Sequence, residues 1–189
     1  MNALRAATLC SLPLFTVFAA TPEPALIDTA KSTMTVRVYK TGILSAFGHD
    51  HVISAPISAG TVDREAGRVD LTVNAADLQV RDPGASADDV AHIQKTMLGP
   101  EVLDTEHHPE IAFRSTAAHA SENVWTVCGD LTLHGQTRPV TVQVRETNGR
   151  FTGSTRVRQS DFGMKPVKVA GGTVGVKDDV QIEFDIALR

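Results

Sequence analysis

The residues best suited to chemistry are two histidines that flank an aspartate, His49 and His51. In an extended segment, residues two positions apart point to the same side, so both imidazoles face one way. Imidazole nitrogen is a common ligand for zinc or copper, and His92 and the pair His107-His108 could complete such a site. No cysteine cluster or His-Glu-x-x-His motif fixes a coordination geometry. The pattern therefore fits either a metal site at His49 and His51 or a hydrogen-bonded structural turn.

Catalytic groups are not indicated by any motif. An aspartate beside a histidine, as at Asp50 or Asp104, could orient an imidazole, but no serine or cysteine stands in a nucleophile motif. Cys128 precedes Gly129 in an apolar stretch, where a cysteine is typically a buried filler rather than a reactive thiolate. We therefore expect a protein that is not an enzyme and that requires no cofactor.

The N-terminus has the order of a secretory signal. A basic residue, Arg5, precedes an apolar run over residues 6–20, which ends in the small residues Ala19 and Ala20. The run contains Pro13 and is shorter than the roughly 20 apolar residues that a membrane-spanning helix needs. We predict that residues 1–20 are a cleavable signal peptide, that no integral membrane span remains after its removal, and that the protein is periplasmic or secreted.

The charge balance argues against nucleic acid as a partner. The chain carries 18 Lys and Arg against 22 Asp and Glu, a net charge of −4, and removal of Arg5 with the signal makes it one unit more negative. Phosphate backbones are bound mainly by clustered basic residues. Because Cys10 also lies in the predicted signal, Cys128 is then the only cysteine, and no intramolecular disulfide is expected. Stability must come from a hydrophobic core.

Apolar residues at every second position dominate the rest of the chain. This alternation predicts half-buried β-strands, and it is clearest over residues 180–188. Asn148-Gly149, between two such segments, is the preferred pair for a tight hairpin. Ser86 opens a helix-capping box and Gly99 ends the stretch, which predicts one helix over residues 87–98. Many strands, one helix and no repeating strand–helix–strand pattern favour an antiparallel sandwich or barrel in a single domain.

Several motifs resemble those of one known family. The segment Gly129-Asp130-Leu131-Thr132-Leu133-His134-Gly135, continued by Thr137-Arg138-Pro139-Val140, resembles the signature of the YceI-like family. The segments Pro109-Glu110-Ile111-Ala112-Phe113, Ser160-Asp161-Phe162-Gly163 and Val174-Gly175 stand in the same order as in that family. The resemblance extends over residues 25–188, which we interpret as one domain. Within the signature, His134 is interpreted as a structural residue at a turn.

The resemblance implies an all-β, lipocalin-like fold, an eight-stranded antiparallel β-barrel with one short amphipathic helix. Members of the family are typically periplasmic and are known or presumed to enclose polyisoprenoid lipids or other long-chain apolar molecules. A polyisoprenoid, a quinone-type lipid or a fatty amide is therefore the expected bound molecule. An eight-stranded barrel has room for its own side chains or for one slim ligand, so this expectation is physically coherent.

The alternation narrows the set of residues that would line such a barrel. The inward candidates are Val36, Val38, Ile111, Phe113, Leu131, Leu133, Val142, Phe184 and Ile186. Phe162 joins them as a residue at a mouth or bend, because it lies beside Gly163 in an irregular stretch. Apolar strand faces also form ordinary packed cores. The sequence leaves both interpretations open.

Two further alternatives are an outer-membrane barrel and a homodimer. An outer-membrane barrel needs girdles of aromatic residues, whereas this chain has one Trp and one Tyr. Charged residues at alternate positions of the last strand, such as Glu183 and Asp185, indicate an outer face that meets water. Exposed β surfaces leave pairing into a homodimer open, although no residue specifies an interface. A long-chain apolar small molecule is the expected partner.

Overall fold

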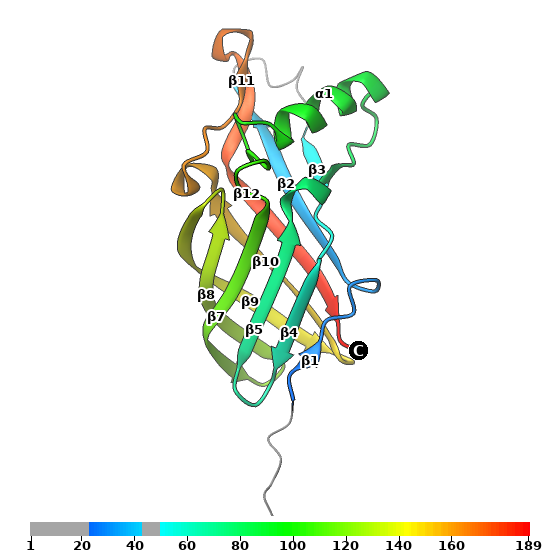
Figure 1. Cartoon of the computed structure of the whole chain (residues 1–189), viewed down its shortest axis with the longest axis vertical. Coiled ribbons are helices and arrows are strands. Elements are labelled where there is room, and N and C mark those ends of the chain that lie inside the picture. The colour runs from blue at the N-terminus through cyan, green and yellow to red at the C-terminus, as the bar shows by residue number, and fades with distance from the viewer. Residues whose placement is uncertain (1–22, 43–49) are drawn as a thin grey trace, which may run out of the picture.

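The computed structural model describes residues 23–42 and 50–189 (Figure 1). The signal peptide predicted for residues 1–20 lies outside them. The described residues form twelve β-strands and one α-helix, with short 3-10 turns. The strands are β1 (Ala25–Leu26), β2 (Thr33–Thr41), β3 (His51–Ser54), β4 (Ala59–Asp63), β5 (Arg68–Asn74), β6 (Gln79–Val80), β7 (Glu110–Ser121), β8 (Val124–Leu133), β9 (Gln136–Thr147), β10 (Arg150–Arg158), β11 (Lys168–Val169) and β12 (Val174–Ala187). The helix is α1 (Ala87–Leu98), and the turns are η2 (Ala75–Asp77), η3 (Gln159–Phe162) and η4 (Ala170–Gly172).

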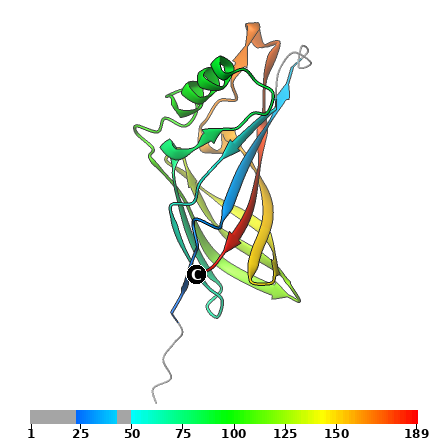
Figure 2. The ribbon, with the colours of Figure 1, turned by 90° about the vertical axis from the view of Figure 1, so that its right-hand side faces the viewer.

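These strands belong to one antiparallel sheet that curls into an elongated, barrel-like shape (Figures 1 and 2). Its order is β1-β4-β5-β7-β8-β9-β10-β12-β2-β3-β6, and β11 pairs with β12 off this path. The predicted all-β antiparallel fold with one helix is confirmed. The predicted count of eight strands is wrong, because the described residues form 12 strands, 11 of them along the path. β1, β6 and β11 have two residues each, too few for an alternation pattern to indicate them.

The segment between β3 and β4 connects the two sides of the curl. β3 pairs with β2, whereas β4 pairs with β5. Between the two strands, the N–H of Ala55 donates to the carbonyl of Met34 at 2.9 Å, and the N–H of Ser58 donates to the carbonyl of Thr72 at 2.9 Å. Pro56 has no N–H to donate, which accounts for the break between β3 and β4. The bent segment thus stays hydrogen-bonded first to one neighbour and then to the other.

Tight two-residue turns join β8 to β9 and β9 to β10. His134-Gly135 has φ values of 50° and 69°, and Asn148-Gly149 has φ values of 51° and 75°. Two consecutive positive φ values are the mark of a type I′ hairpin turn. The predicted hairpin at Asn148-Gly149 is confirmed by the pairing of Thr147 with Arg150. The turn at His134-Gly135 places a histidine at the end of the sheet near α1.

Helix α1 begins and ends where the sequence predicts. The hydroxyl of Ser86 accepts from the N–H of Asp89 at 3.1 Å and donates to the carboxylate of the same residue at 2.7 Å. Gln94 attaches the helix to the sheet, because its amide donates to the carbonyl of Leu78 at 2.7 Å and accepts from the N–H of Val80 at 2.8 Å. No helix in the described part of the chain is long and apolar enough to cross a membrane.

Buried apolar side chains form two clusters inside the curl. The cluster nearer the helix, here the α1-side cluster, includes Met97 and Phe162. The other, here the distal cluster, includes Ile27 and Phe151. The ring of Phe113 packs against both. Helix α1 and the turn between β4 and β5 lie at opposite ends of the sheet (Figure 1).

Candidate functional site

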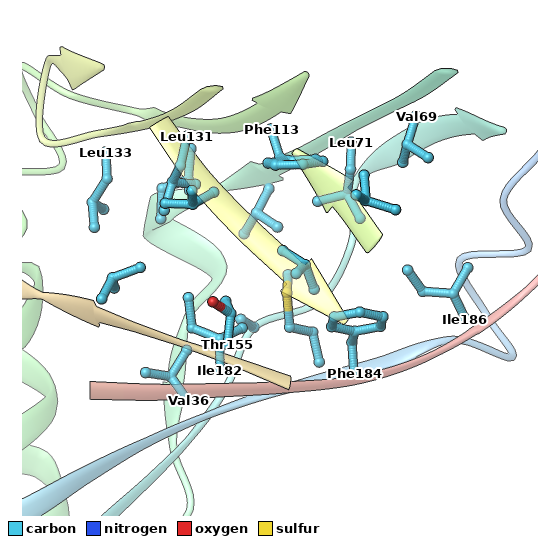
Figure 3. Close-up of a pocket in the computed structure, with 18 of the residues that line it drawn as sticks. Val36, Val69, Leu71, Phe113, Leu131, Leu133, Thr155, Ile182, Phe184 and Ile186 are labelled. Atoms are coloured by element: carbon cyan, nitrogen blue, oxygen red, sulfur yellow. The ribbon is translucent and has the colours of Figure 1, made fainter. Parts of the chain in front are cut away.

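A cavity of about 250 Å³ lies inside the curled sheet, bordered by side chains from both clusters. Its lining consists mostly of Val, Leu, Ile, Phe and Met side chains. Figure 3 shows these side chains pointing into one space from strands on opposite walls of the curl. Such a space can accept an apolar group, because apolar surface that leaves water gains free energy roughly in proportion to its area.

The strand register explains why these side chains share one face. In an antiparallel sheet, residues directly opposite each other point to the same side. Ile182 in β12 stands opposite Val36 in β2 and Thr155 in β10, and all three border the cavity. The alternation of residues 180–186 therefore continues across three neighbouring strands.

Nine of the ten sequence-predicted lining residues border the cavity. They are Val36, Val38, Ile111, Phe113, Leu131, Leu133, Val142, Phe184 and Ile186. Phe162 does not border it, because η3 directs its ring into the packed α1-side cluster, where it is 1% exposed. Leu131 and Val142 are buried and also border the cavity. The same residues therefore belong to the packed core and to the cavity lining. That these residues bind a ligand stays a prediction.

Two aromatic rings of the lining lie against glycines of neighbouring strands. A Cβ atom at Gly129 would stand 2.5 Å from Cζ of Phe113, and one at Gly153 would stand 2.6 Å from Cζ of Phe184. Real carbon atoms do not approach so closely, so only glycine lets each ring lie flat on the sheet. The two glycines thereby leave room for both rings against the wall of the cavity.

Most polar side chains along the cavity already have partners. Arg64 pairs with Glu146 at 3.0 Å, and its guanidinium lies 5.0 Å from the ring centroid of Phe151. Thr155 donates to the carbonyl of Thr141 at 3.2 Å. Over the described residues, no buried side-chain nitrogen or oxygen lacks a hydrogen-bond partner. The interior therefore offers a ligand apolar contact rather than charge.

The predicted metal ligands His49 and His51 are not seen together. His49 lies outside the described residues. Nδ1 of His51 lies 2.6 Å from the carboxylate of Asp82, which also accepts from the N–H of Val52 at 2.7 Å. His51 is thus held by a buried carboxylate between β3 and the segment after β6. A metal site at these two histidines stays a prediction.

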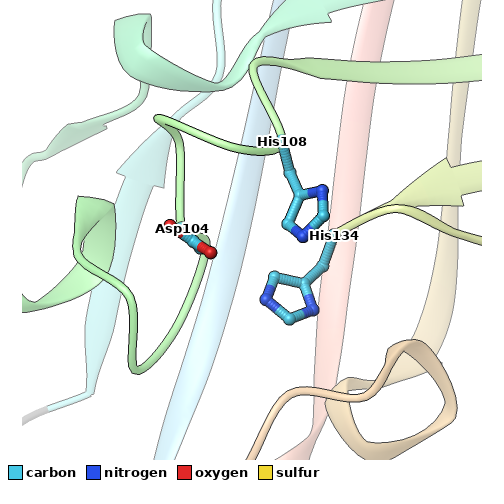
Figure 4. Close-up of side chains that lie close together, drawn as sticks. All are labelled: Asp104, His108 and His134. Carbon is cyan, nitrogen blue, oxygen red and sulfur yellow. The ribbon is translucent and has the colours of Figure 1, made fainter.

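A different group of ligating side chains comes together near α1. Asp104, His108 and His134 each place a ligating atom within 4.8 Å of the others (Figure 4). The carboxylate of Asp104 also hydrogen-bonds Nδ1 of His107 at 2.9 Å, which raises the pKa of that imidazole. The sequence offered one signal for this group, the short spacing from Asp104 to His108. It could not show that the turn between β8 and β9 brings His134 beside them.

Fold and interior together define a barrel-like, all-β protein with an apolar cavity. Residues 26–188 match the YceI-like domain, and the chain belongs to that family, as its motifs predict. A UPF0312 protein of Pseudomonas putida is 32% identical over 105 residues, which cover 49% of this chain and 53% of the relative. The chain thus spans about half the length of several curated relatives. A UPF0312 protein of Shewanella oneidensis is 26% identical over 83% of this chain and 85% of its own.

Solved structures share the fold. BcnA of Burkholderia cenocepacia superposes with a TM-score of 0.61 at 23% identity, covering 85% of this chain and 98% of its own. A mutant CJ YceI protein with a monobromobimane guest superposes with a TM-score of 0.51 at 13% identity, covering 72% of this chain and 81% of its own. At these identities the likeness concerns the arrangement of the strands.

Proposed function

We propose that this protein binds one long, slim apolar molecule inside the curled sheet, in the manner of a lipocalin. A polyisoprenoid, a quinone-type lipid or a fatty amide has the matching chemistry. The observation that carries the proposal is the cavity itself, whose lining is mostly apolar and whose polar neighbours are mostly paired. The proposed role is that of a carrier rather than an enzyme, with no cofactor required.

Hydrophobic transfer alone supplies enough free energy for such a complex. Each methylene that leaves water contributes about 0.8 kcal/mol, so about ten of them match the roughly 8 kcal/mol of a micromolar complex before ordering costs are subtracted. Ligand sites for drug-sized molecules usually measure about 300–1,000 Å³. The cavity, at about 250 Å³, is smaller than this. We therefore expect a slim ligand that widens the cavity as it enters.

Three methionines of the lining supply the adaptability that widening needs. Met34 lies in β2, Met97 in α1 and Met164 just after η3, and all three border the cavity. Methionine side chains are unbranched and change rotamer readily, so they accommodate ligands of variable shape. A ligand made of repeated isoprene or methylene units fits such a lining better than a rigid polar one.

The setting of the carrier follows from the N-terminal pattern. The basic residue, apolar run and small residues of positions 1–20 support export to the periplasm or secretion. A long apolar molecule has little solubility in the aqueous space between membranes. A protein that encloses such a molecule could carry it through that space. Pairing into a homodimer is compatible with this role.

Extraction of the natively purified protein with organic solvent, followed by mass spectrometry, tests the proposal. We expect a stoichiometric long-chain apolar compound. A matched pair of variants then locates it: Val142→Phe fills the cavity, whereas Gln143→Phe adds the same ring at the exposed neighbouring position of β9. Val142→Phe should displace the compound and Gln143→Phe should retain it. An empty extract together with equal binding of an apolar fluorescent probe by both variants would refute the proposal.

A further inference from the structure

The cluster of Asp104, His108 and His134 lies where three separate segments meet. Asp104 belongs to the loop after α1, His108 stands two residues before β7, and His134 begins the turn between β8 and β9. One ligating atom from each lies within 4.8 Å of the other two, and all three residues are half-buried. Figure 4 shows the carboxylate and the two rings facing a common space. The cluster is thus accessible to a small ion and also partly sheltered from water.

The imidazole of His134 is oriented by the backbone of η3. Its Nδ1 lies 3.1 Å from the carbonyl oxygen of Phe162. A carbonyl oxygen can only accept a hydrogen bond, so Nδ1 carries the proton and Nε2 keeps its lone pair. Histidines that bind metals commonly donate their other ring N–H to a carbonyl in this way, which fixes the tautomer and the ring orientation.

The imidazole of His108 occupies a position that only a glycine neighbour permits. A Cβ atom at Gly135 would stand 2.7 Å from Cε1 of His108 and 2.9 Å from its Nδ1. The two histidine rings meet edge to face, with centroids 4.7 Å apart and planes at 64°. The turn that positions His134 therefore also makes room for His108.

The carboxylate of Asp104 is held in the same short loop as His108. The carbonyl of Asp104 accepts from the N–H of His108 at 2.8 Å, and its own N–H donates to the carbonyl of Gly99 at 2.9 Å. One outside group competes for the carboxylate, because Nδ1 of His107 lies 2.9 Å from one oxygen and 3.0 Å from the other. A carboxylate has about four acceptor positions. The bond to His107 therefore leaves positions for a further partner.

We propose that Asp104, His108 and His134 form a binding site for a divalent transition-metal ion such as zinc. Two imidazole nitrogens and one carboxylate oxygen are a ligand set that holds zinc or ferrous iron, with the remaining positions open to water. Zinc bonds of about 2.0–2.1 Å in a tetrahedral site place ligand atoms about 3.4 Å apart. The three ligating atoms lie within 4.8 Å of one another, so zinc binding would draw them closer together.

The site stands beside the cavity but does not depend on it. Asp104 follows Leu103 and His134 follows Leu133, and both leucines border the cavity. A bound ion would thus lie at the α1 end of the apolar interior. Metal binding uses none of the lining side chains, so it can succeed or fail independently of the apolar ligand.

The site is tested by isothermal titration calorimetry, in which zinc is added to the protein after a chelator has removed any bound metal. The variants His108→Asn and His134→Asn remove one ligand each, and asparagine tolerates the positive φ of position 134. His119→Ala removes an exposed histidine of β7 as the matched control. We expect one zinc ion per chain in the wild type and the control, and an affinity lowered roughly tenfold or more in each cluster variant. Circular dichroism checks that the variants fold.

Two outcomes would overturn the proposal. One is the absence of stoichiometric zinc binding in the wild type. The other is unchanged affinity in both folded cluster variants, and loss of binding in His49→Ala would then assign the ion to the other histidine pair.

Discussion

The two ends of the cavity differ in how their charged and polar groups are satisfied. At the distal end, Arg64 pairs with Glu146 and covers the ring of Phe151, so opposite charges neutralise each other near the surface. At the α1 end, Nδ1 of His134 is occupied by a backbone carbonyl, and its other nitrogen faces His108 and Asp104. At the distal end, Arg64 and Glu146 thus satisfy each other's charge. The α1 end instead presents ligating atoms to a further partner.

Their packing differs as well. The α1 end is held by deeply buried groups, among them Phe162 and the hydrogen bonds of Gln94 to β6 and the residue before it. The distal end also buries Ile27, but it is bordered by the exposed guanidinium of Arg64. Substitutions at the α1 end should therefore change stability and ligand exchange more than substitutions at the distal end, and the following four variants test this difference.

Phe162→Ala should cause the largest loss of stability. The ring is 1% exposed within the α1-side cluster, and truncation of a buried phenylalanine costs about 3–5 kcal/mol. Phe113→Ala is the comparison, because the Phe113 ring borders an existing cavity and already lacks contacts on one side. Urea unfolding should show the greater loss for Phe162→Ala. Equal losses would mean that the cavity is filled in solution.

Gly129→Ala should act on the wall between the two ends. The new Cβ would stand 2.5 Å from the ring of Phe113 and 2.5 Å from the carbonyl oxygen of Arg114. The ring can swing toward the cavity but the backbone cannot move freely, so we expect a cost of about 3 kcal/mol, at the upper end for overpacking. Binding of an apolar fluorescent probe should also weaken. The neighbouring Cys128→Ala, outside the cavity lining, should preserve probe binding, and weakening in that variant too would contradict this explanation.

Helix α1 should control access from its end of the cavity. Gln94→Ala removes two hydrogen bonds to backbone groups of Leu78 and Val80, each contributing about 0.5–1.5 kcal/mol. We expect a loss of about 2 kcal/mol and faster release of a bound probe in stopped-flow measurements. Lys95→Ala, an exposed neighbour, is the control. An unchanged release rate in Gln94→Ala would place the entrance elsewhere.

Most of the cavity lining was predictable from the sequence. The lining followed from alternation, because a period of two is local and the register extends it from Ile182 to Val36 and Thr155. Alternation could not place Phe162, because this residue lies in a 3-10 turn, where side chains do not alternate with a period of two. The count of eight strands came from the family resemblance, and alternation could not correct it, because two-residue strands carry no pattern.

The metal-ligating cluster required tertiary information. Asp104 and His108 are close in sequence, but His134 joins them only because the hairpin of β8 and β9 turns beside the loop that follows α1. The sequence directed attention to His49 and His51 instead, whose spacing has a simple local interpretation. Groupings that depend on long-range strand pairing are invisible to arguments from spacing.

Arg64→Ala should have the smallest effect, and it tests whether the distal end is merely covered. The partly exposed pair with Glu146 contributes about 0.2–1 kcal/mol, and the contact with the Phe151 ring adds a similar amount. We expect a loss of no more than about 1 kcal/mol, reduced further by salt, with unchanged affinity for an uncharged apolar probe. If instead the affinity for an apolar probe with an anionic end falls sharply while that for the uncharged probe does not, Arg64 recognises the polar end of the ligand. The α1 end would then hold its tail, and the comparison of the two ends would be reversed.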